Sequence, residues 1–284
     1  MVDYKIKHFV IIRFFPKQHP NYPFDIFDVN FLSKQLLLAQ NALASLENQK
    51  NKNFELVFLA NEKFFDNEKY EFVFSMLRAL TVLPIKFVKI SDTSWMYAKS
   101  ELSTLLKDAF DEYDYVIQTR LDFDDFVYKN AVADTQDKVG ECDNVLAYGY
   151  CNGYQYVDGE LYKYHSTFNE VGCKSAFISL ILKSSFAKTL PFLSIYSFGH
   201  DTCKTDLKKF LEKQGIKFSD KMFKQNTSAK AFIYYRHDLS LYSWRTKGNG
   251  EIEIPRSSPF TNATITEKKL KKEFGFFREL QSIE

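Results

Sequence analysis

The sequence has little of what marks several common protein classes. No apolar run approaches the roughly 18 residues that a membrane-spanning helix needs, and the first apolar stretch, Phe9–Ile12, is shorter than a secretory signal requires. The four cysteines form no C-x-x-C pair, so neither a zinc site nor a redox pair is indicated. We therefore expect a cytoplasmic protein with reduced thiols.

Glycine and excess charge are also scarce. The sequence contains only ten glycines, with no glycine-rich dinucleotide fingerprint, and it has no G-x-x-x-x-G-K-[ST], G-x-S-x-G or H-E-x-x-H motif. These absences argue against a phosphate-loop enzyme, a serine hydrolase of the elbow type and a zinc protease. The 38 basic and 36 acidic residues leave a net charge of +2, so no nucleic-acid partner is expected.

The chain does have enough apolar residues for one large folded domain. It contains 284 residues, of which 45% are hydrophobic and 17% aromatic, and this length can bury a sizeable core. The aromatic residues could serve as stacking surfaces for sugars, or they could reflect a compositional bias of the genome. We expect one domain over residues 1–245 and an extension over 246–284, made of a loop at Lys247–Thr261 and an amphipathic helix at Thr266–Leu280.

Apolar patterning predicts an α/β fold. The first half alternates between four strands and three helices, and this alternation favours a parallel sheet. The second half is less regular, with two further strands, one helix and a tyrosine-rich segment at Cys142–Tyr156. The expected strands are His8–Phe14, Phe54–Ala60, Ile85–Ile90, Tyr113–Thr119, Ser175–Leu182 and Ala231–Tyr235, and the expected helices are Val29–Glu47, Glu68–Leu80, Ala98–Phe110 and Thr205–Gln214.

An acidic cluster directly follows the fourth strand. Asp122, Asp124 and Asp125 place three carboxylates within four residues, and such a group is stable when solvated or when a cation neutralises it. Hard oxygen ligands suit Mg²⁺ or Mn²⁺, and ligands of parallel sheets bind beyond the carboxyl ends of the strands. The cluster is therefore a candidate metal site, with a solvated acidic turn as the alternative.

Two later segments could add further chemistry. His200 and Asp201 stand just before the helix at Thr205, where they could supply a general base, or Asp201 or Thr202 could simply cap the helix. His237 follows the last apolar strand, and a neutral imidazole there could complete a metal site. A plain polar turn is the alternative for His237.

Taken together, these segments resemble glycosyltransferases of the GT-A type, family 2-like, and most narrowly the rhamnosyltransferase family. Thr119–Asp125 is similar to the "TRLDNDD" form of the DXD segment, and it is the most specific part of a likeness that covers roughly residues 5–245. The other segments that carry the likeness are Ile12-Arg13-Phe14, Ala44–Gln49 with Phe54–Ala60, Gly199–Asp201 with the helix that stops at Gly215, and Arg236–Ser240.

The resemblance implies a Rossmann-like nucleotide-diphospho-sugar transferase fold, with a mixed, mainly parallel central sheet flanked by helices. It implies a metal-dependent, inverting transfer of a sugar from a nucleotide-diphosphate sugar to a hydroxyl of a saccharide or lipid-linked glycan, in bacterial capsule or lipooligosaccharide synthesis. Mn²⁺ or Mg²⁺ would be the cofactor. The implied roles are Asp201 as base, Asp124 as main metal ligand with Asp122, Asp125 and His237, and Arg13, Arg120 and Asp122 as contacts to the donor.

Several points stay open at this stage. Asp125 could coordinate the metal or hold the turn, and Arg120 could bind phosphate or form a salt bridge with the acidic cluster. The helix at 266–280 could rest on the inner face of the cytoplasmic membrane or pack back on the domain. His200 stands where the family has Glu, which leaves a non-catalytic nucleotide- or sugar-binding module as one alternative function and a metal-dependent nucleotidyltransferase as another.

Overall fold

A computed structural model describes residues 4–15, 22–91, 99–157, 160–165, 175–199, 202–236 and 267–275. Its strands are β1 (Ile6–Phe14), β2 (Glu55–Asn61), β3 (Ile85–Ile90), β4 (Tyr115–Asp122), β5 (Phe126–Val127), β6 (Val145–Val157), β7 (Glu160–His165), β8 (Ile178–Lys183) and β9 (Phe223–Arg236). The α-helices are α1 (Val29–Glu47), α2 (Glu62–Phe65), α3 (Glu71–Ala79), α4 (Lys99–Glu112), α5 (Ala131–Asp137), α6 (Ser184–Ala187), α7 (Cys203–Lys213) and α9 (Glu267–Phe274). Short 3₁₀ turns are η1 (Glu68–Tyr70), η2 (Lys138–Glu141), η3 (Ile195–Ser197) and η4 (Asp220–Met222).

The described strands form one mixed sheet in the order β3-β2-β1-β4-β8-β6-β9-β5, with β7 added beside β6. Strands β3, β2, β1 and β4 run parallel, β8 is antiparallel to both of its neighbours, and β6 and β9 run parallel to each other. The expected α/β class with a mixed sheet is therefore confirmed. The parallel half matches the strands that the sequence predicts, because their near-continuous apolar runs are typical of strands buried on both faces.

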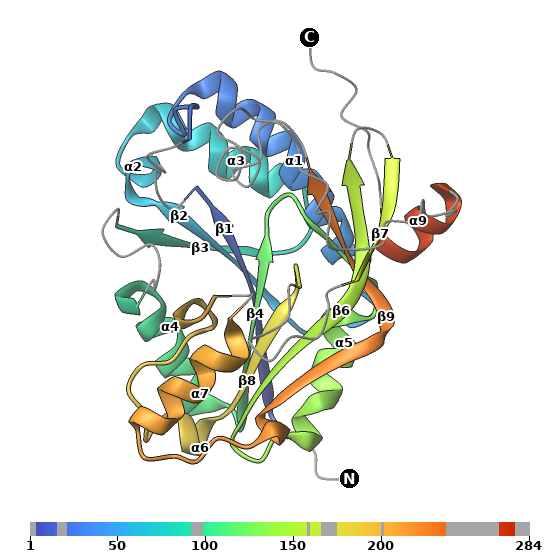
Figure 1. Ribbon diagram of the computed structural model, residues 1–284. Coiled ribbons are helices and arrows are strands. Elements are labelled where there is room, and N and C mark those ends of the chain that lie inside the picture. Colours follow the sequence, from blue (N-terminus) through green and yellow to red (C-terminus); the bar gives the residue numbers. More distant parts are fainter. Residues whose placement is uncertain are drawn as a thin grey trace.

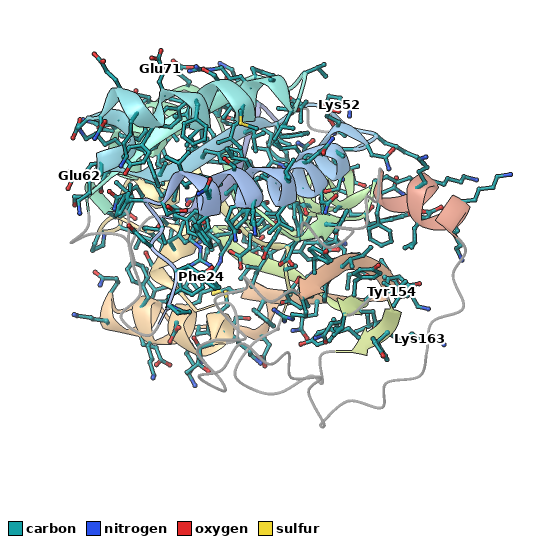
Figure 2. All side chains as sticks on the ribbon, turned by 90° about the horizontal axis from the view of Figure 1, so that it is seen from above. Phe24, Lys52, Glu62, Glu71, Tyr154 and Lys163 are labelled. Atoms are coloured by element: carbon teal, nitrogen blue, oxygen red, sulfur yellow. The ribbon has the colours of Figure 1, made fainter. Side chains whose placement is uncertain are left out.

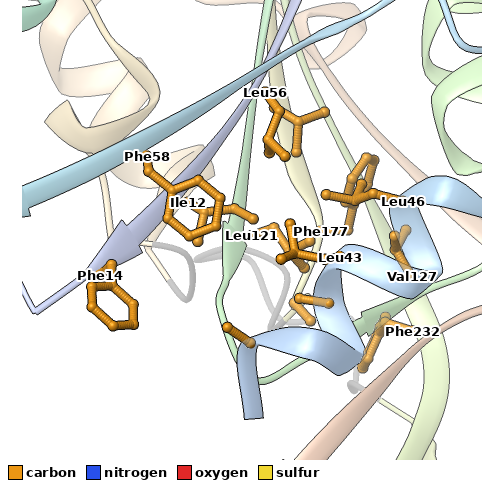
Figure 3. Close-up of a cluster of buried hydrophobic side chains, with 14 of the residues drawn as sticks. Ile12, Phe14, Leu43, Leu46, Leu56, Phe58, Leu121, Val127, Phe177 and Phe232 are labelled. Carbon is orange, nitrogen blue, oxygen red and sulfur yellow. The ribbon is translucent and has the colours of Figure 1, made fainter. Parts of the chain in front are cut away.

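Helices cover both faces of the parallel half (Figure 1). On one face, side chains of β1, β2 and β4 pack with α1, α2 and α3, and on the other they pack with α4, α7 and η3. Figure 3 shows part of the first core, where Leu43 and Leu46 of α1 meet Ile12, Phe58 and Leu121 of the sheet. Helix α1 begins where the Asp28 side chain accepts a hydrogen bond from the backbone N–H of Phe31 at 2.8 Å, as an N-cap residue does.

The second half of the sheet curls past the end of β4. Strand β8 pairs with β6 only as far as Tyr148, and beyond that point β6 pairs with β9 and β7. Strand β5 begins four residues after β4 ends, and it pairs with β9 through Phe126 and Ile233. The far ends of β6 and β9 are thereby carried back toward the carboxyl end of β4.

A buried chain of polar side chains links β1, β4 and β8. The Nε2 atom of His8 lies 2.7 Å from the Thr119 hydroxyl, which lies 2.7 Å from the Ser179 hydroxyl. The amide of Gln136 donates to His8 Nδ1 at 3.3 Å, so Nε2 carries the proton of a neutral ring. Burial lowers the pKa of His8 to about 3, so the imidazole stays neutral in the folded protein.

The C-terminal helix differs from its predicted extent. Helix α9 ends at Phe274, and Gly275 has a φ of +89°, a left-handed conformation that ends helices and favours glycine. Leu270 and Phe274 are buried against Leu38, Phe126 and Tyr154. The packed-back alternative is thus the one observed for these two apolar side chains.

Candidate functional site

The carboxyl ends of β1 and β4 bring two arginines to one aspartate. Arg13 and Asp122 are register partners on these neighbouring strands, and Arg13 Nη2 donates to Asp122 Oδ1 at 2.7 Å. Arg120, on the same strand as Asp122, places Nη2 at 3.9 Å from the same oxygen. The sequence separates Arg13 from the other two by more than 100 residues, and the parallel register brings the three together. Arg120 therefore forms the salt bridge with the acidic cluster that was one of its two expected roles.

A buried tyrosine lies against both guanidinium groups. The Tyr196 ring centroid is 5.6 Å from Arg13 Cζ and 5.5 Å from Arg120 Cζ, within the range of cation–π attraction. The Tyr196 hydroxyl donates to the backbone oxygen of Ile11 at 3.0 Å, which fixes the ring on β1. Tyr196 thus holds the two arginines in place beside Asp122.

The charges of this group favour an anionic ligand. Burial lowers the pKa of Arg13, but the combined effects of Asp122, Tyr196 and Asp124 outweigh burial, so the net shift of this pKa is upward and the guanidinium stays charged. Burial, followed by repulsion from Arg13, lowers the pKa of Arg120. Two guanidiniums face the carboxylate of Asp122, and forked guanidinium donors match phosphate oxygens. A phosphate group bound here would offset the repulsion between the two arginines.

Asp125 has a structural role at the turn. It is buried, and its Oδ1 accepts a hydrogen bond from the backbone N–H of Tyr235 at 3.1 Å. Burial, followed by repulsion from Asp124 and Asp122, raises the pKa of Asp125 well above its ordinary value. The side chain therefore fastens β9 to the acidic turn, which is the turn-holding alternative that the sequence left open.

The end of β9 joins the same group. Arg236 Cζ lies 4.5 Å from the centroid of the Tyr234 ring, and the backbone N–H of the next residue, Tyr235, donates to Asp125. The candidate ligand His237 directly follows Arg236 and lies outside the described residues. The described chain thus reaches the acidic cluster one residue before the predicted histidine.

The residues before the predicted base are fixed to the sheet. The backbone N–H of Ile195 donates to the side-chain oxygen of Gln118 at 3.0 Å, and the amide of Gln118 donates to the Leu193 carbonyl at 3.4 Å. Gln118 is fully buried on β4. Since η3 also carries Tyr196, the same segment that supports the arginines leads toward position 200.

The two neighbours of His200 and Asp201 share one partner. The Gly199 N–H and the Thr202 hydroxyl both donate to Asp206 Oδ2, at 3.2 and 2.5 Å. Thr202 occupies the N-cap position of α7, but its side chain makes no capping bond to the helix backbone, so that part of the capping alternative is wrong. His200 and Asp201 themselves lie outside the described residues.

The donor chemistry of the acidic turn suits a divalent cation. Mg²⁺ and Mn²⁺ take carboxylate oxygens, and Mg²⁺ binds through one or two of them together with substrate phosphates. Because Asp125 is buried and holds Tyr235, Asp122 and Asp124 are the carboxylates that fit this role. Within the described part of the chain, no group of three or more histidine, cysteine, aspartate or glutamate side chains could hold a metal ion.

Sequence reasoning missed Tyr196 and Gln118. The strand of Gln118 could be located from apolar patterning, but nothing in the immediate sequence of either residue marks it as part of the site. Their placement follows from the register of β4 and from the path of η3. Cys142, Cys151 and Cys203 are buried. None of the helices in the described ranges is long and apolar enough to cross a membrane.

Comparisons with solved structures find distant similarity. The chain is similar to TarS of S. aureus with a TM-score of 0.41 and 13% identity, covering 81% of this chain and 36% of TarS. It is similar to mouse xyloside xylosyltransferase 1 (TM-score 0.37, 12% identity, 78% of this chain and 85% of that one). It is also similar to the 4-diphosphocytidyl-2C-methyl-D-erythritol synthase of Anaerococcus prevotii (0.38, 12%, 78% and 86%). No protein-family model and no curated protein sequence matches the chain.

Proposed function

We propose that this protein is a metal-dependent, inverting glycosyltransferase that moves a sugar from a nucleotide-diphosphate sugar to a hydroxyl of a glycan. The observation that carries the proposal is the Arg13–Asp122–Arg120 group at the carboxyl ends of β1 and β4. Ligands of α/β sheets bind at this edge, and the group combines phosphate-binding donors with carboxylates in one place. The resemblance of Thr119–Asp125 to a DXD segment supports the same reaction.

In this proposal Arg13 and Arg120 bind the diphosphate of the donor, while Tyr196 keeps their guanidiniums oriented. Asp124 and Asp122 would hold the divalent cation, with His237 as a further ligand. A bound cation would neutralise charge on the diphosphate leaving group. Asp125 is a positioning residue in this proposal, because its carboxylate holds β9 against the turn.

The acceptor oxygen attacks the anomeric carbon as the bond from that carbon to the diphosphate oxygen breaks. Asp201 takes the proton of the acceptor hydroxyl, as a positioned carboxylate can, and the nucleoside diphosphate leaves with the bonding pair. One displacement of this kind inverts the anomeric centre. The hydrogen bonds of Gly199 and Thr202 to Asp206 support the base by fixing both ends of its segment.

We further propose a cytoplasmic location, with a lipid-linked or free saccharide as acceptor in the assembly of a bacterial capsule or lipooligosaccharide. Helix α9 exposes Lys268, Lys269, Lys271 and Lys272 while Leu270 and Phe274 are buried. Leu270 and Phe274 are packed against the domain, so helix α9 would contact a membrane through its lysines. Such a contact within 266–280 would be electrostatic. Rhamnose is one candidate sugar.

Product analysis tests the reaction. The protein is incubated with UDP-, GDP-, CDP- and dTDP-sugars, Mn²⁺ and a mixture of glycoside acceptors. We expect release of a nucleoside diphosphate, and loss of this release in Asp201→Asn. Release of pyrophosphate from a nucleoside triphosphate and a sugar phosphate would instead establish nucleotidyl transfer. Binding of a nucleotide sugar without turnover would establish the non-catalytic module.

A further inference from the structure

Phe15 has a left-handed backbone conformation, with a φ of +44°. Among the described ranges, no other residue except glycine has a positive φ. This conformation crowds the Cβ of an L-residue against the backbone, and for a bulky side chain it is an outlier. Such a conformation persists only where the surrounding structure enforces it, and it is often found at functional sites. Phe15 directly follows β1, two residues after Arg13.

The left-handed backbone changes the face of the sheet on which the ring lies. Side chains alternate between the two faces along a strand. On β1, Ile11 packs into the core with α4 and α7, and Arg13 lies on the same face, against Tyr196. Continued alternation would place Phe15 on that face as well. Its ring instead packs into the opposite core, beside Phe14 (Figure 3 shows Phe14 in this core).

This change of face keeps a large ring away from Arg13. The Arg13 side chain is 22% exposed and that of its partner Asp122 is 35% exposed, so both can be reached from solvent. A ring that continued the alternation would lie on the same side as the guanidinium. The conformation of Phe15 is therefore compatible with a ligand at Arg13.

On the opposite face, Phe15 contacts the middle of the acidic turn. Phe123 stands between Asp122 and Asp124 in the sequence. Its half-buried ring has its centroid 5.2 Å from that of Phe15 and 5.5 Å from that of Phe14. Aromatic rings at such separations attract one another in tilted and edge-to-face arrangements. The two carboxylates thus flank a side chain that is packed against the end of β1.

Phe15 is supported in turn by the start of α1. Its ring centroid lies 5.3 Å from that of Phe31, and Phe24 stacks on Phe31 with centroids 5.4 Å apart and an interplanar angle of 14°. Figure 2 shows Phe24 on this side of the molecule, well apart from Tyr154 of β6. These ring contacts offset the cost of the left-handed backbone and hold Phe15 against Phe123.

A metal site built on this turn needs its carboxylates in fixed positions. Side chains that support metal ligands are nearly as important as the ligands themselves. Hydrogen bonds of Asp122 and Asp125 hold the two ends of the turn. The ring of Phe123 adds a contact in the middle, directly before Asp124.

We propose that Phe15 is a positioning residue of the acidic turn, which it fixes through the ring of Phe123. The carboxylates of Asp122 and Asp124, on either side of that ring, are thereby held where a divalent cation can bind. This inference rests on the proposed function, in which these two carboxylates bind the cation. Phe15 itself touches neither the cation nor the donor.

The experiment measures Mn²⁺-dependent nucleotide binding by the full chain. Isothermal titration with UDP, GDP, CDP and dTDP, each with Mn²⁺ and with EDTA, selects the nucleotide that wild type binds best. Its affinity is then measured for Phe15→Ala, Phe15→Tyr, Phe123→Ala and the double variant Phe15→Ala/Phe123→Ala. Phe87→Ala is the matched control, because Phe87 is also half-buried and its ring lies 4.8 Å from that of Phe74, on the outer strand β3.

We expect Phe15→Ala and Phe123→Ala each to weaken Mn²⁺-dependent binding about tenfold, as the loss of support for a metal ligand does. The affinity in EDTA should stay at its wild-type value, because Arg13 lies on the other face of the sheet. Phe15→Tyr keeps the ring and should bind like wild type. The double variant should bind no more weakly than the weaker single variant, because the two rings form one contact. Phe87→Ala should lower the melting temperature about as much as Phe15→Ala while keeping the wild-type affinity.

Unchanged Mn²⁺-dependent affinity in Phe15→Ala would overturn the inference. An equal loss of affinity in Phe87→Ala would overturn it too, because the cause would then be general destabilisation. Additive losses in the double variant would show that Phe15 does not act through Phe123. In all three cases wild type still binds nucleotide with Mn²⁺, and the proposed function stands. A wild type that shows no Mn²⁺-dependent nucleotide binding would instead contradict the proposed function itself.

Discussion

Arg13 and Asp122 join the carboxyl ends of two parallel strands through a hydrogen-bonded ion pair of 2.7 Å. The pair is only part-buried, so its contribution to stability is small. In the proposed function its greater role is in donor binding, where Arg13 exchanges the carboxylate for a phosphate.

We expect Arg13→Met to weaken nucleoside diphosphate binding by about tenfold or more, because a charge-assisted, forked contact is lost, and to cost about 1 kcal/mol of stability. Isothermal titration with the preferred nucleotide measures the first effect and urea unfolding the second. Lys7→Met is the control, since Lys7 forms a 2.6 Å ion pair with Glu55 at the other end of β1. Equal nucleotide affinity in the two variants would exclude Arg13 from the donor site.

Two substitutions of Asp125 test whether its carboxylate is structural or binds the metal. Asp125→Leu leaves the buried N–H of Tyr235 unpaired and should cost about 1–3 kcal/mol, whereas Asp125→Asn keeps an acceptor oxygen and should fold normally. We expect Asp125→Asn to retain the metal-dependent response to nucleotide, measured by thermal shift. Loss of that response in a folded Asp125→Asn protein would show that this carboxylate binds the metal.

His8 makes stability depend on pH. Its pKa is lowered in the fold to about 3, against about 6.5 in an unfolded chain. The stability from its neutral form is therefore complete above pH 6.5 and is lost as pH falls from there toward 3. Between pH 6.5 and 4.5, wild type should lose about 2 kcal/mol more unfolding free energy than His8→Gln. Parallel pH profiles of the two proteins, from urea unfolding, would contradict this.

A substitution at Gly153 tests how closely β6 and β9 pack. A Cβ atom there would lie 2.6 Å from the Phe232 ring and 2.7 Å from its backbone oxygen, closer than packing allows. We expect Gly153→Ala to lose about 1–3 kcal/mol of stability, as overpacked sites do. Gly140→Ala, where a Cβ meets no atom within 4 Å, should show no comparable loss. Equal stability of the two variants in urea would mean that these strands pack differently.

The sequence predicted the parallel half of the fold closely. Residues 29–47 form α1 with the expected bounds, and Phe54–Ala60 and Ile85–Ile90 correspond to β2 and β3, because regular apolar patterns mark them. The long strands β6 and β9 were seen only in part. Their pairing has register shifts between Tyr150 and Tyr154, and the polar start of β9 carries no simple alternation.

The site was predictable to a similar degree. The position of Asp122 and Asp124 at the end of a buried strand follows from local sequence, and so does that of Arg13 at the end of β1. The role of Asp125 and the proximity of Tyr196 depend on contacts between segments far apart in the chain. Residues 200, 201 and 237 lie outside the described part of the structure, so their roles stay predictions.

The most direct measurement is the melting temperature in the presence of UDP, GDP, CDP or dTDP, each with Mn²⁺, with Mg²⁺ and with EDTA. A ligand that binds only the folded state raises this temperature by mass action. We expect one nucleotide to raise it in the presence of metal, and the metal-dependent part to vanish in Asp124→Ala but not in Asp108→Ala, which removes an exposed carboxylate of α4. No shift with any nucleotide, or a shift that Asp124→Ala leaves unchanged, would contradict a metal-dependent nucleotide-sugar site at this edge of the sheet.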